Sequence, residues 1–310
     1  MDRFEAMAML VAAIDAGSLS AASRSLKVPL PTLSRKISDL ETLVGTRMLV
    51  RSTRKLALTD AGVAYVAAAR RILEQVDDAQ REAAGEFITP KGELVVTAPL
   101  LFGRLYVLPV ITDFLAQFPE INVRLVLADH NIQLAEAHVD MAVRIGRLPD
   151  SSMVATEVGK LRTVVCASPA LLAGHGEPKT PHDLRSIPCV TVEIPMPYPG
   201  WRFQPSRSNT IIDIPIASRL SVSTAEAAVD AAISGVGLTR LLHYQVAKAV
   251  DAGLLQIVLR EFEAALAPVN LLHASRGHMP LKMRRFLDFA APKLREALEK
   301  LNQSDLAVAK

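Results

Sequence analysis

The chain has 310 residues, half of them hydrophobic, and a net charge of +3 when the histidines are neutral. This length predicts about two domains, and two cysteines, Cys166 and Cys189, are too few for a scaffold held by several disulfides. No basic segment leads into an apolar run at the start and no apolar run approaches the ~18 residues of a membrane span, so we expect a cytoplasmic protein with no membrane partner.

The first predicted helix runs from Phe4 to Ala16 and ends at Gly17, which suits a left-handed C-terminal position. Its expected core face consists of Phe4, Met7, Leu10, Val11 and Ile14. Two shorter helices with a turn between them are expected within residues 18–43. Ser20 is the expected N-cap of the first. Pro31 suits the first turn of the second, because a proline lacks the N–H that would be unpaired there.

The second of these short helices is amphipathic. Its apolar stripe recurs at every third or fourth position and consists of Leu33, Ile37 and Leu40. Its opposite face is short or cationic and consists of Thr32, Ser34, Arg35 and Ser38. A helix that is buried on one side and carries donors on the other suits the major groove of DNA. An ordinary helical hairpin with a solvated polar face is the alternative.

The charge around this helix favours DNA. Between Arg24 and Lys55 the chain has eight cations and two anions, a net charge of +6, and phosphate neutralisation is the commonest use of such a cluster. Two short strands, Met48–Val50 and Leu56–Leu58, enclose a basic tip that resembles the wing of a winged helix; an exposed hairpin that merely carries charges is the alternative. The candidate DNA-contacting residues are Ser20, Pro31, Thr32, Ser34, Arg35, Ser38, Arg51, Arg54 and Lys55.

A long helix is predicted after Thr59, which is a suitable N-cap. Its apolar stripe consists of Val66, Ala69, Leu73 and Val76. A stripe on a long helix ahead of a separate domain needs a partner. We expect a second copy of the chain to be that partner, with burial against the chain's own C-terminal part as the alternative.

Gly and Pro residues within 85–92 predict a hinge, and beyond it strands alternate with helices. This alternation predicts an α/β fold with a mainly parallel sheet. The expected strands are Leu94–Ala98, Val123–Ala128, Met141–Ile145, Val164–Ala167, Cys189–Val192, Arg219–Val222, Leu238–Leu242 and Val269–Ala274. The expected helices are Leu105–Phe118, Gln133–Ala137, Ala225–Ile233 and Leu281–Leu301.

Several segments together resemble the LysR-type transcriptional regulators. The N-terminal ones are MDRFEAMAMLVAAIDAGSLSAASRSL, PTLSRKISDLE, GTRMLVRSTRKLALTDAG and RRILEQ. The later segments VVTAPLLFGRLYVLPVITDFL, DMAVRIGRLPDSS and VVCASPALLA are similar to that family's effector domain. The chain departs from the family at Pro29-Leu30-Pro31, where many members read Ser-Gln-Pro. In those members the Ser would cap the recognition helix and the Gln would read a base edge, and neither Pro29 nor Leu30 has a side chain for these roles.

The resemblance implies three parts. Residues 1–59 would form a winged helix-turn-helix DNA-binding domain, and residues 60–91 a linker and dimerisation helix with a hinge. Residues 92–304 would form an effector domain with two lobes, like a type 2 periplasmic binding protein, with lobe I at about 92–165 and 267–304 and lobe II at about 166–266. The implied partners are double-stranded promoter DNA, a small-molecule effector, further copies in a dimer or tetramer, and RNA polymerase. No cofactor is implied.

The expected effector site lies at the carboxyl ends of the strands, where ligands of open α/β sheets bind near helix N-termini. Trp201 and Arg202 are added because they resemble a family motif that borders the cleft. The candidate residues are Thr97, Leu100, Leu101, Phe102, Asp129, Arg144, Gly146, Trp201, Arg202, Ser223, Thr224 and Thr239. Structural packing is the alternative for each residue taken alone.

We expect the effector to be a small organic anion. Two strand-to-helix turns would offer free N–H groups, Arg144 and Arg202 would offer guanidinium groups, and Phe102 and Trp201 flat apolar walls. In the alternative, both arginines form internal ion pairs and the aromatic rings pack.

No catalytic motif appears, and the seven histidines lack metal-ligand spacing, so we expect neither an enzyme nor a metal site. Cys166 lies in the expected strand VVCAS, which favours a buried thiol over a redox sensor. The rival interpretation is a solute-binding protein, which the same effector fold would supply. Residues 1–60 and the lack of a signal peptide argue against it.

Overall fold

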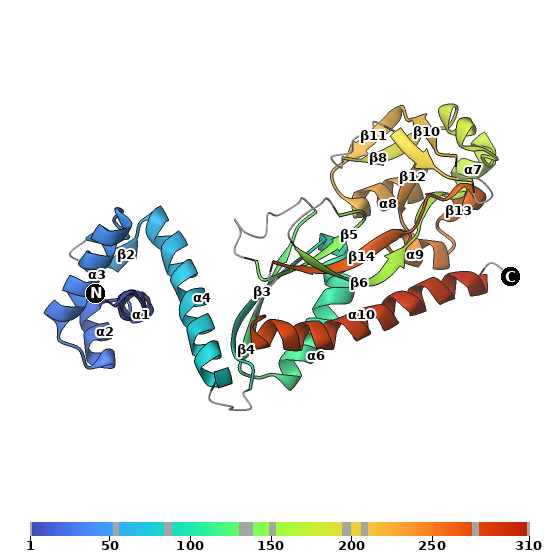
Figure 1. The fold of residues 1–310 in the computed structure, drawn as a ribbon. Coiled ribbons are helices and arrows are strands. Elements are labelled where there is room, and N and C mark those ends of the chain that lie inside the picture. Colours follow the sequence, from blue (N-terminus) through green and yellow to red (C-terminus); the bar gives the residue numbers. More distant parts are fainter. Residues whose placement is uncertain are drawn as a thin grey trace.

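The computed structural model describes residues 2–51, 56–83, 89–129, 139–148, 153–193, 200–205, 210–274 and 279–308. A small helical domain at the N-terminus is followed by one long helix, and then by an α/β part with two lobes (Figure 1). The expected helix over Gln133–Ala137 and residues 85–88 of the expected hinge lie outside the described residues.

The N-terminal domain contains helices α1 (Arg3–Asp15), α2 (Leu19–Leu26) and α3 (Leu30–Val44) and the strands β1 (Leu49–Arg51) and β2 (Leu56–Leu58). The expected core face of α1 is wrong in part. The buried residues of α1 are Ala6, Met9, Leu10 and Ala13, whereas Phe4 is 48% exposed and Met7, Val11 and Ile14 are half-buried. Because α1 packs against α2, α3 and α4 together, small alanines occupy the close contacts and the first-turn Phe4 lies outside them.

The helix starts differ from expectation by one or two residues. Ser18, and not Ser20, is the N-cap of α2, since its hydroxyl accepts a hydrogen bond from the Ala21 N–H at 3.1 Å. Helix α3 begins at Leu30, so Pro31 lies within its first turn as expected. Its N-cap, Pro29, contributes no side-chain hydrogen bond. Gly17 and Gly45 both have positive φ at helix ends, as the sequence predicts.

Helix α4 (Asp60–Ala83) leaves the wing and reaches toward the α/β part (Figure 1). Thr59 caps it as expected, because the Gly62 N–H donates to the Thr59 hydroxyl at 3.0 Å. Position 62 requires glycine, since a Cβ there would lie 2.1 Å from the Met48 carbonyl oxygen. This close approach holds α4 against the base of the wing.

Lobe I is a five-stranded sheet in the order β4-β3-β5-β14-β6. Its strands are β3 (Gly92–Ala98), β4 (Ile121–Leu127), β5 (Met141–Ile145), β6 (Val154–Leu161) and β14 (Ala267–His273). A continuous helical run covers one face, with α5 (Leu100–Phe102), the π-helical turn η1 (Gly103–Val107) and α6 (Leu108–Gln117). The last helix, α10 (Leu281–Val308), covers the same core. The run Leu100–Gln117 is apolar and long enough to cross a membrane, but its side chains Val110, Ile111 and Phe114 are buried in this core.

Lobe II is a second five-stranded sheet, in the order β11-β8-β12-β7-β13. Its strands are β7 (Thr163–Ala167), β8 (Cys189–Val192), β11 (Ser218–Val222), β12 (Leu238–Leu242) and β13 (Gln256–Val258), with a hairpin of β9 (Gly200–Phe203) and β10 (Ile212–Pro215). Its helices are α7 (Pro169–His175), α8 (Ala225–Ile233) and α9 (His243–Asp251), with the 3-10 turns η2 (Pro181–Arg185) and η3 (Arg260–Phe262).

Four of the five strands in each sheet run in the same direction, so the mainly parallel sheet that the sequence predicts is confirmed apart from one reversed strand in each lobe. In lobe I, β4, β3 and β5 run parallel, but β14 is antiparallel to both β5 and β6. In lobe II, β11, β8 and β12 are parallel, while β7 is antiparallel to β12 and β13. The antiparallel pairs arise because the strands next to each crossing enter the sheet from the other lobe.

The chain crosses between the lobes twice, as the family resemblance implies. The first crossing lies between β6 and β7 at Arg162, and the second lies between η3 and β14 at Glu263. These two residues form a bidentate ion pair, with Nε–Oε2 at 2.7 Å and Nη2–Oε1 at 2.5 Å. Both side chains are mostly buried, so the pair joins the crossings directly.

Candidate DNA interface and effector crevice

Helix α3 buries its expected stripe. Leu33, Ile37 and Leu40 are all buried in the core of the N-terminal domain. Thr32, Ser34 and Ser38 are half-buried and Arg35 is exposed. The polar face is therefore open to a partner, as the amphipathic pattern predicts.

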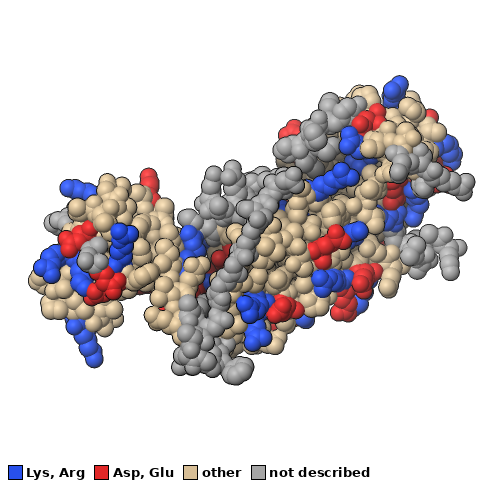
Figure 2. Space-filling view, in the orientation of Figure 1, with Lys and Arg blue, Asp and Glu red and all other residues tan. Residues whose placement is uncertain are grey.

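The two neighbouring cations on α3 differ in whether they form an ion pair within the protein. Lys36 forms an ion pair with Glu5 of α1 and is tied to the protein. Arg35 forms no ion pair or hydrogen bond with the residues described here. Figure 2 shows other Lys and Arg side chains on the visible face of this domain, next to a few acidic ones. Arg35 is therefore the cation of α3 that is available to a base or phosphate.

The start of α3 presents an apolar side chain. The N–H groups of Thr32 and Leu33 donate to the Pro29 carbonyl at 3.0 and 3.1 Å. Leu30 is the first helical residue and is 40% exposed. Residues at this end of a recognition helix contact base edges, so Leu30 offers an apolar contact where a polar reader is common in the family.

The wing is held against α3. Its strands pair in register from Leu49 opposite Leu58 to Arg51 opposite Leu56. The Glu41 carboxylate of α3 accepts hydrogen bonds from the N–H groups of Met48 and Leu49, at 2.7 and 2.9 Å. Arg51 ends β1, and the candidates Arg54 and Lys55 lie outside the described residues. Ser20 is exposed on α2.

On the effector side, the start of the lobe I helical run is packed. Phe102 is fully buried, with its ring 4.9 Å from that of Tyr106 and 5.4 Å from that of Tyr244. Leu101 is buried and Leu100 is partly exposed. Since Tyr244 comes from α9, it joins lobe II to the core of lobe I. The Phe102 ring therefore serves packing between the lobes.

The N-terminus of this helical run already has a carboxylate. Asp129 accepts a hydrogen bond from the Leu100 N–H at 2.9 Å. Burial raises the pKa of the Tyr244 phenol, and the negative charges of Asp129 and Glu226 raise it further. Both carboxylates therefore act electrostatically on the same tyrosine. Glu226 occupies the first turn of α8, whose N-cap is Thr224. Negative charge therefore stands at both helix starts where the sequence predicts an anion.

The remaining candidates of lobe I are partly or fully buried. Thr97 is fully buried in β3, and its hydroxyl has no hydrogen-bond partner among the described residues. Arg144 is half-buried in β5 and donates to its neighbouring carbonyl at Val143. Burial lowers the pKa of its guanidinium. Gly146 follows with a φ of +101°.

The candidates of lobe II differ in their contacts and in their exposure. Arg202 forms a bidentate pair with Asp213 across the β9–β10 hairpin, at 2.8 and 3.0 Å, and this hydrogen bonding lowers the pKa of Asp213. Trp201 is buried in the lobe II core. Thr239 is fully buried within β12, whereas Ser223 is exposed. For Arg202 and Trp201 the structure therefore shows the ion pair and packing that the sequence left open as the alternative.

Three residues that the sequence analysis did not single out stand out here: Tyr244, Arg240 and Lys282. Burial lowers the pKa of Arg240 to about 10, and its guanidinium lies 5.9 Å from the Phe203 ring centre. Lys282, at the start of α10, is buried and is taken up below. Arg240 lies in a largely apolar run, which is a signal that would have found it, whereas no such run surrounds Tyr244 or Lys282.

The cysteines are buried as expected. Burial raises the pKa of the Cys166 thiol to about 12 and that of Cys189 to about 11, which keeps both thiols protonated and unreactive at neutral pH. Among the described residues no group of three or more His, Cys, Asp or Glu side chains is placed to hold a metal ion.

The fold and sequence agree with two family profiles. Residues 4–63 match the "Bacterial regulatory helix-turn-helix protein, lysR family", and residues 89–295 match the "LysR substrate binding domain". The chain belongs to the LysR family. It is a LysR-type transcriptional regulator, with a DNA-binding domain at the N-terminus and a two-lobed effector-binding domain after it.

Relatives extend over nearly the whole chain. An HTH-type transcriptional regulator of Xanthomonas campestris is 32% identical over 289 residues, 92% of this chain and 84% of that protein. An HTH-type transcriptional repressor of Pseudomonas aeruginosa is 31% identical over 93% of this chain and 91% of that one. The structure of CrgA, a LysR-type regulator from Neisseria meningitidis, has a TM-score of 0.59 at 29% identity and covers 94% of this chain and 98% of that one.

We predict that Arg35→Ala weakens specific DNA binding by about 1–3 kcal/mol, a loss of roughly fivefold to 150-fold in affinity, because an arginine contact to a base edge is removed. Fluorescence anisotropy on an operator obtained by in vitro selection measures it. Arg104→Ala is the matched control, since it removes an exposed cation from lobe I. Equal affinities of the Arg35 variant and the wild type would contradict the assignment.

Proposed function

We propose that this regulator binds an inverted-repeat promoter site as a dimer and that a small molecule between the lobes of its effector domain controls it. The observation that carries the DNA part is α3, which buries Leu33, Ile37 and Leu40 and exposes Leu30 and Arg35 beside a wing. We infer a cytoplasmic, non-enzymatic role with RNA polymerase as a further partner, since the matched relatives are named transcriptional regulators. A role in solute binding alone would leave this N-terminal surface without a purpose.

We infer that Leu30 contacts the methyl group of a thymine. An exposed leucine at the start of a recognition helix presents only methyl groups to the major groove, and thymine alone offers a methyl there. Pro29 before it and Pro31 after it leave no side-chain donor or acceptor in that turn. Sequence readout at this position is then apolar.

This inference predicts that replacing one thymine of the selected operator by deoxyuridine weakens binding about fourfold, the equivalent of about 0.8 kcal/mol for one buried methyl group. Scanning each thymine in turn by fluorescence anisotropy finds the position. In Leu30→Ala the same replacement should have no effect, because the partner side chain is already gone. A scan in which no thymine methyl matters, or in which Leu30→Ala keeps the full effect, would refute the contact.

Dimerisation through α4 stays a proposal, with a narrower seam than the sequence suggests. Val66 and Ala69 are buried in the protomer, and Val66 belongs to the core that α1 forms with α2 and α3. Leu73 and Val76 are only half-buried and Ile72 is 38% exposed. These three side chains form the apolar part of α4 that a second copy would cover. A tetramer would require a further contact between effector domains.

We predict that Leu73→Glu combined with Val76→Glu converts the dimer to a monomer, because two carboxylates would be buried in an apolar seam. Size-exclusion chromatography with light scattering gives the mass. Ala64→Glu, an exposed position on the same helix, is the control and should stay dimeric. A monodisperse wild-type monomer at micromolar concentration would refute the proposal.

For the effector, the organic anion remains the sequence prediction, and Arg144 is its remaining cationic support. Asp129 and Glu226, which lie in the field of Tyr244 from both lobes, favour in addition a hydrogen-bond donor or ammonium group on the ligand. A ligand that carries both an anionic group and a donor satisfies both sides of the crevice. A structure of LysG from Corynebacterium glutamicum, titled as having bound effector Arg, shares the fold at 21% identity and a TM-score of 0.57.

We predict that calorimetric titration of the full chain with panels of carboxylates, amino acids, amines and neutral sugars selects ligands that carry both groups. Asp129→Asn should weaken such a ligand about tenfold, the loss of one charge-assisted hydrogen bond. Glu157→Gln, an exposed acid elsewhere on lobe I, is the control. Binding of a neutral sugar alone, with no response to any charged ligand, would overturn both the anion and the donor.

A further inference from the structure

A groove of about 920 Å³ separates α4 from lobe I. One wall comes from α4, with Arg70, Glu74 and Asp77, and the other comes from the start of β3, from Asp140 and from α10. Most side chains along it are charged, in contrast to the apolar cores on either side. The contact between the DNA-binding half and the effector half of the molecule is therefore mainly electrostatic in this groove.

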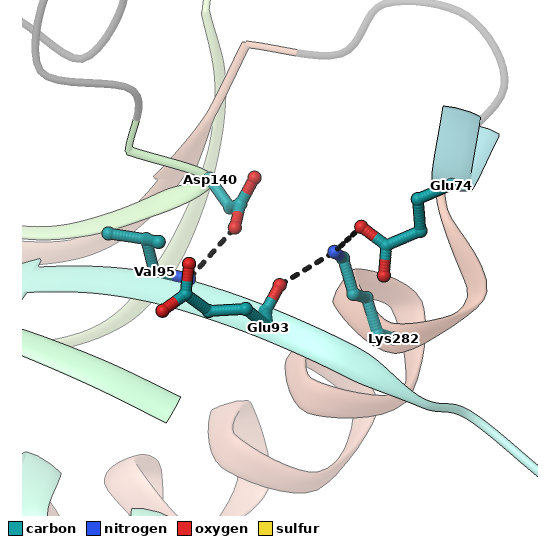
Figure 3. Close-up of polar contacts among 5 residues, drawn as sticks. All are labelled: Glu74, Glu93, Val95, Asp140 and Lys282. Atoms are coloured by element: carbon teal, nitrogen blue, oxygen red, sulfur yellow. Dashed lines mark hydrogen bonds and ion pairs between the residues drawn. The ribbon is translucent and has the colours of Figure 1, made fainter. Parts of the chain in front are cut away.

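The groove holds a buried lysine with two partners from different halves of the chain. Lys282 at the start of α10 is 5% exposed. Its Nζ lies 2.5 Å from Glu74 Oε2 of α4 and 2.6 Å from the Glu93 carbonyl oxygen of β3 (Figure 3). An ammonium group in such a place is costly unless it is paired and hydrogen-bonded. The Glu74 carboxylate supplies the compensating charge, so moving α4 away would leave that charge uncompensated.

The backbone beside this contact is shaped to receive Glu74. Gly92 has a φ of +100°, a conformation that residues with a Cβ rarely adopt. A Cβ at this position would lie 1.9 Å from Glu74 Oε1. The φ of position 92 therefore favours glycine, and a side chain there would also displace the end of the flexible Glu74 side chain.

Strand β3 connects this contact to the effector crevice. It begins at Gly92 and Glu93 in the groove and ends at Ala98, two residues before Leu100, whose N–H is held by Asp129. Asp140 fixes the middle of the strand, because its carboxylate accepts the Val95 N–H at 2.8 Å (Figure 3). Strand β3 therefore reaches from the crevice to the groove.

We propose that Glu74, Lys282 and the Glu93 carbonyl form a linker clamp that sets the angle of α4 on lobe I and couples the effector domain to the DNA-binding arm. Only the effect of the clamp on DNA binding rests on the proposed function. Its structural part concerns α4 and lobe I alone. A shift of β3 in the crevice displaces the Glu93 carbonyl and Gly92 together, and α4 follows through Glu74.

Hydrogen–deuterium exchange of the full chain tests the structural part. Glu74→Gln should speed amide exchange about tenfold in α4 and in the first residues of β3, because the buried ammonium loses its countercharge. Lys282→Gln should have the same effect, because it removes the ammonium group from the same contact. The two changes combined should do no more than either alone, since they break one contact. Glu157→Gln, from the exposed Glu157–Lys160 pair, is the control.

Circular dichroism confirms that each variant is folded. Unchanged exchange in Glu74→Gln, or additive effects of Glu74→Gln and Lys282→Gln, would overturn the clamp.

DNA binding tests the coupling part. Operators with two selected half-sites are compared with versions whose spacing is increased by one helical turn, about 10 base pairs. The wild type should discriminate between the spacings, and Glu74→Gln should lose most of that discrimination while keeping its affinity for a single half-site. If Glu74→Gln speeds amide exchange but discriminates between the operator spacings as the wild type does, the coupling to DNA is refuted and the clamp itself stands. If the wild type binds no selected DNA, the proposed function is refuted. The hydrogen–deuterium exchange measurements then still test the clamp.

Discussion

The insertion of β14 between β5 and β6 is the pairing on which the effector half depends. This strand pairs with β5 from Val269 to His273 and with β6 along its whole length, yet it lies more than a hundred residues after both. Until β14 arrives, lobe I consists of two separate pieces. The excursion that forms lobe II must therefore start and end at the same place, and the Arg162–Glu263 pair marks that place. Helix α10 follows β14 directly, so the position of Lys282 also depends on this pairing.

The distribution of carboxylates gives the two helix starts near the crevice a common character. A helix N-terminus is a ready anion site only while its N–H groups are free. Here Asp129 accepts from Leu100, while Thr224 caps α8 and Glu226 lies in its first turn. Carboxylates of the protein itself are therefore the anions at these two helix starts. A ligand that enters between the lobes meets oxygen acceptors there, which is the reverse of what the bare strand-to-helix pattern suggests.

Local pattern predicted most of the secondary structure, because helix caps and apolar periods act over a few residues. Strands β8 and β12 and helix α8 have their predicted bounds, and the buried stripe of α3 is as expected. The errors occur where partners are distant in sequence. Phe4 looks apolar enough for the core, but the alanines of α1 fill the close contacts with three helices. The reversed direction of β14 was not predicted, because it follows from the entry of this strand from lobe II and not from its own residues.

The site residues also divide into those set by local pattern and those set by partners distant in sequence. Arg35 could be placed on the exposed face of α3 from spacing alone, since orientation within one helix is a local property. Arg202 could not, because its partner Asp213 is set by the register of the β9–β10 hairpin. Lys282 and Glu74 are 208 residues apart, and no period or motif links them. Beside their contact the sequence has a glycine at position 92, which its φ of +100° favours.

Helix α4 is therefore held by two kinds of contact at different places along its length. Near its start, Val66 and the approach of Gly62 to Met48 fix it to the DNA-binding domain through apolar packing. Further along, Glu74 fixes it to lobe I through a buried charge. Apolar packing is insensitive to small sliding movements, whereas a short ion pair to a buried ammonium has few acceptable geometries. A helix held in this way moves as one piece with its DNA-binding domain, and its angle responds to the position of a single lysine on the effector side.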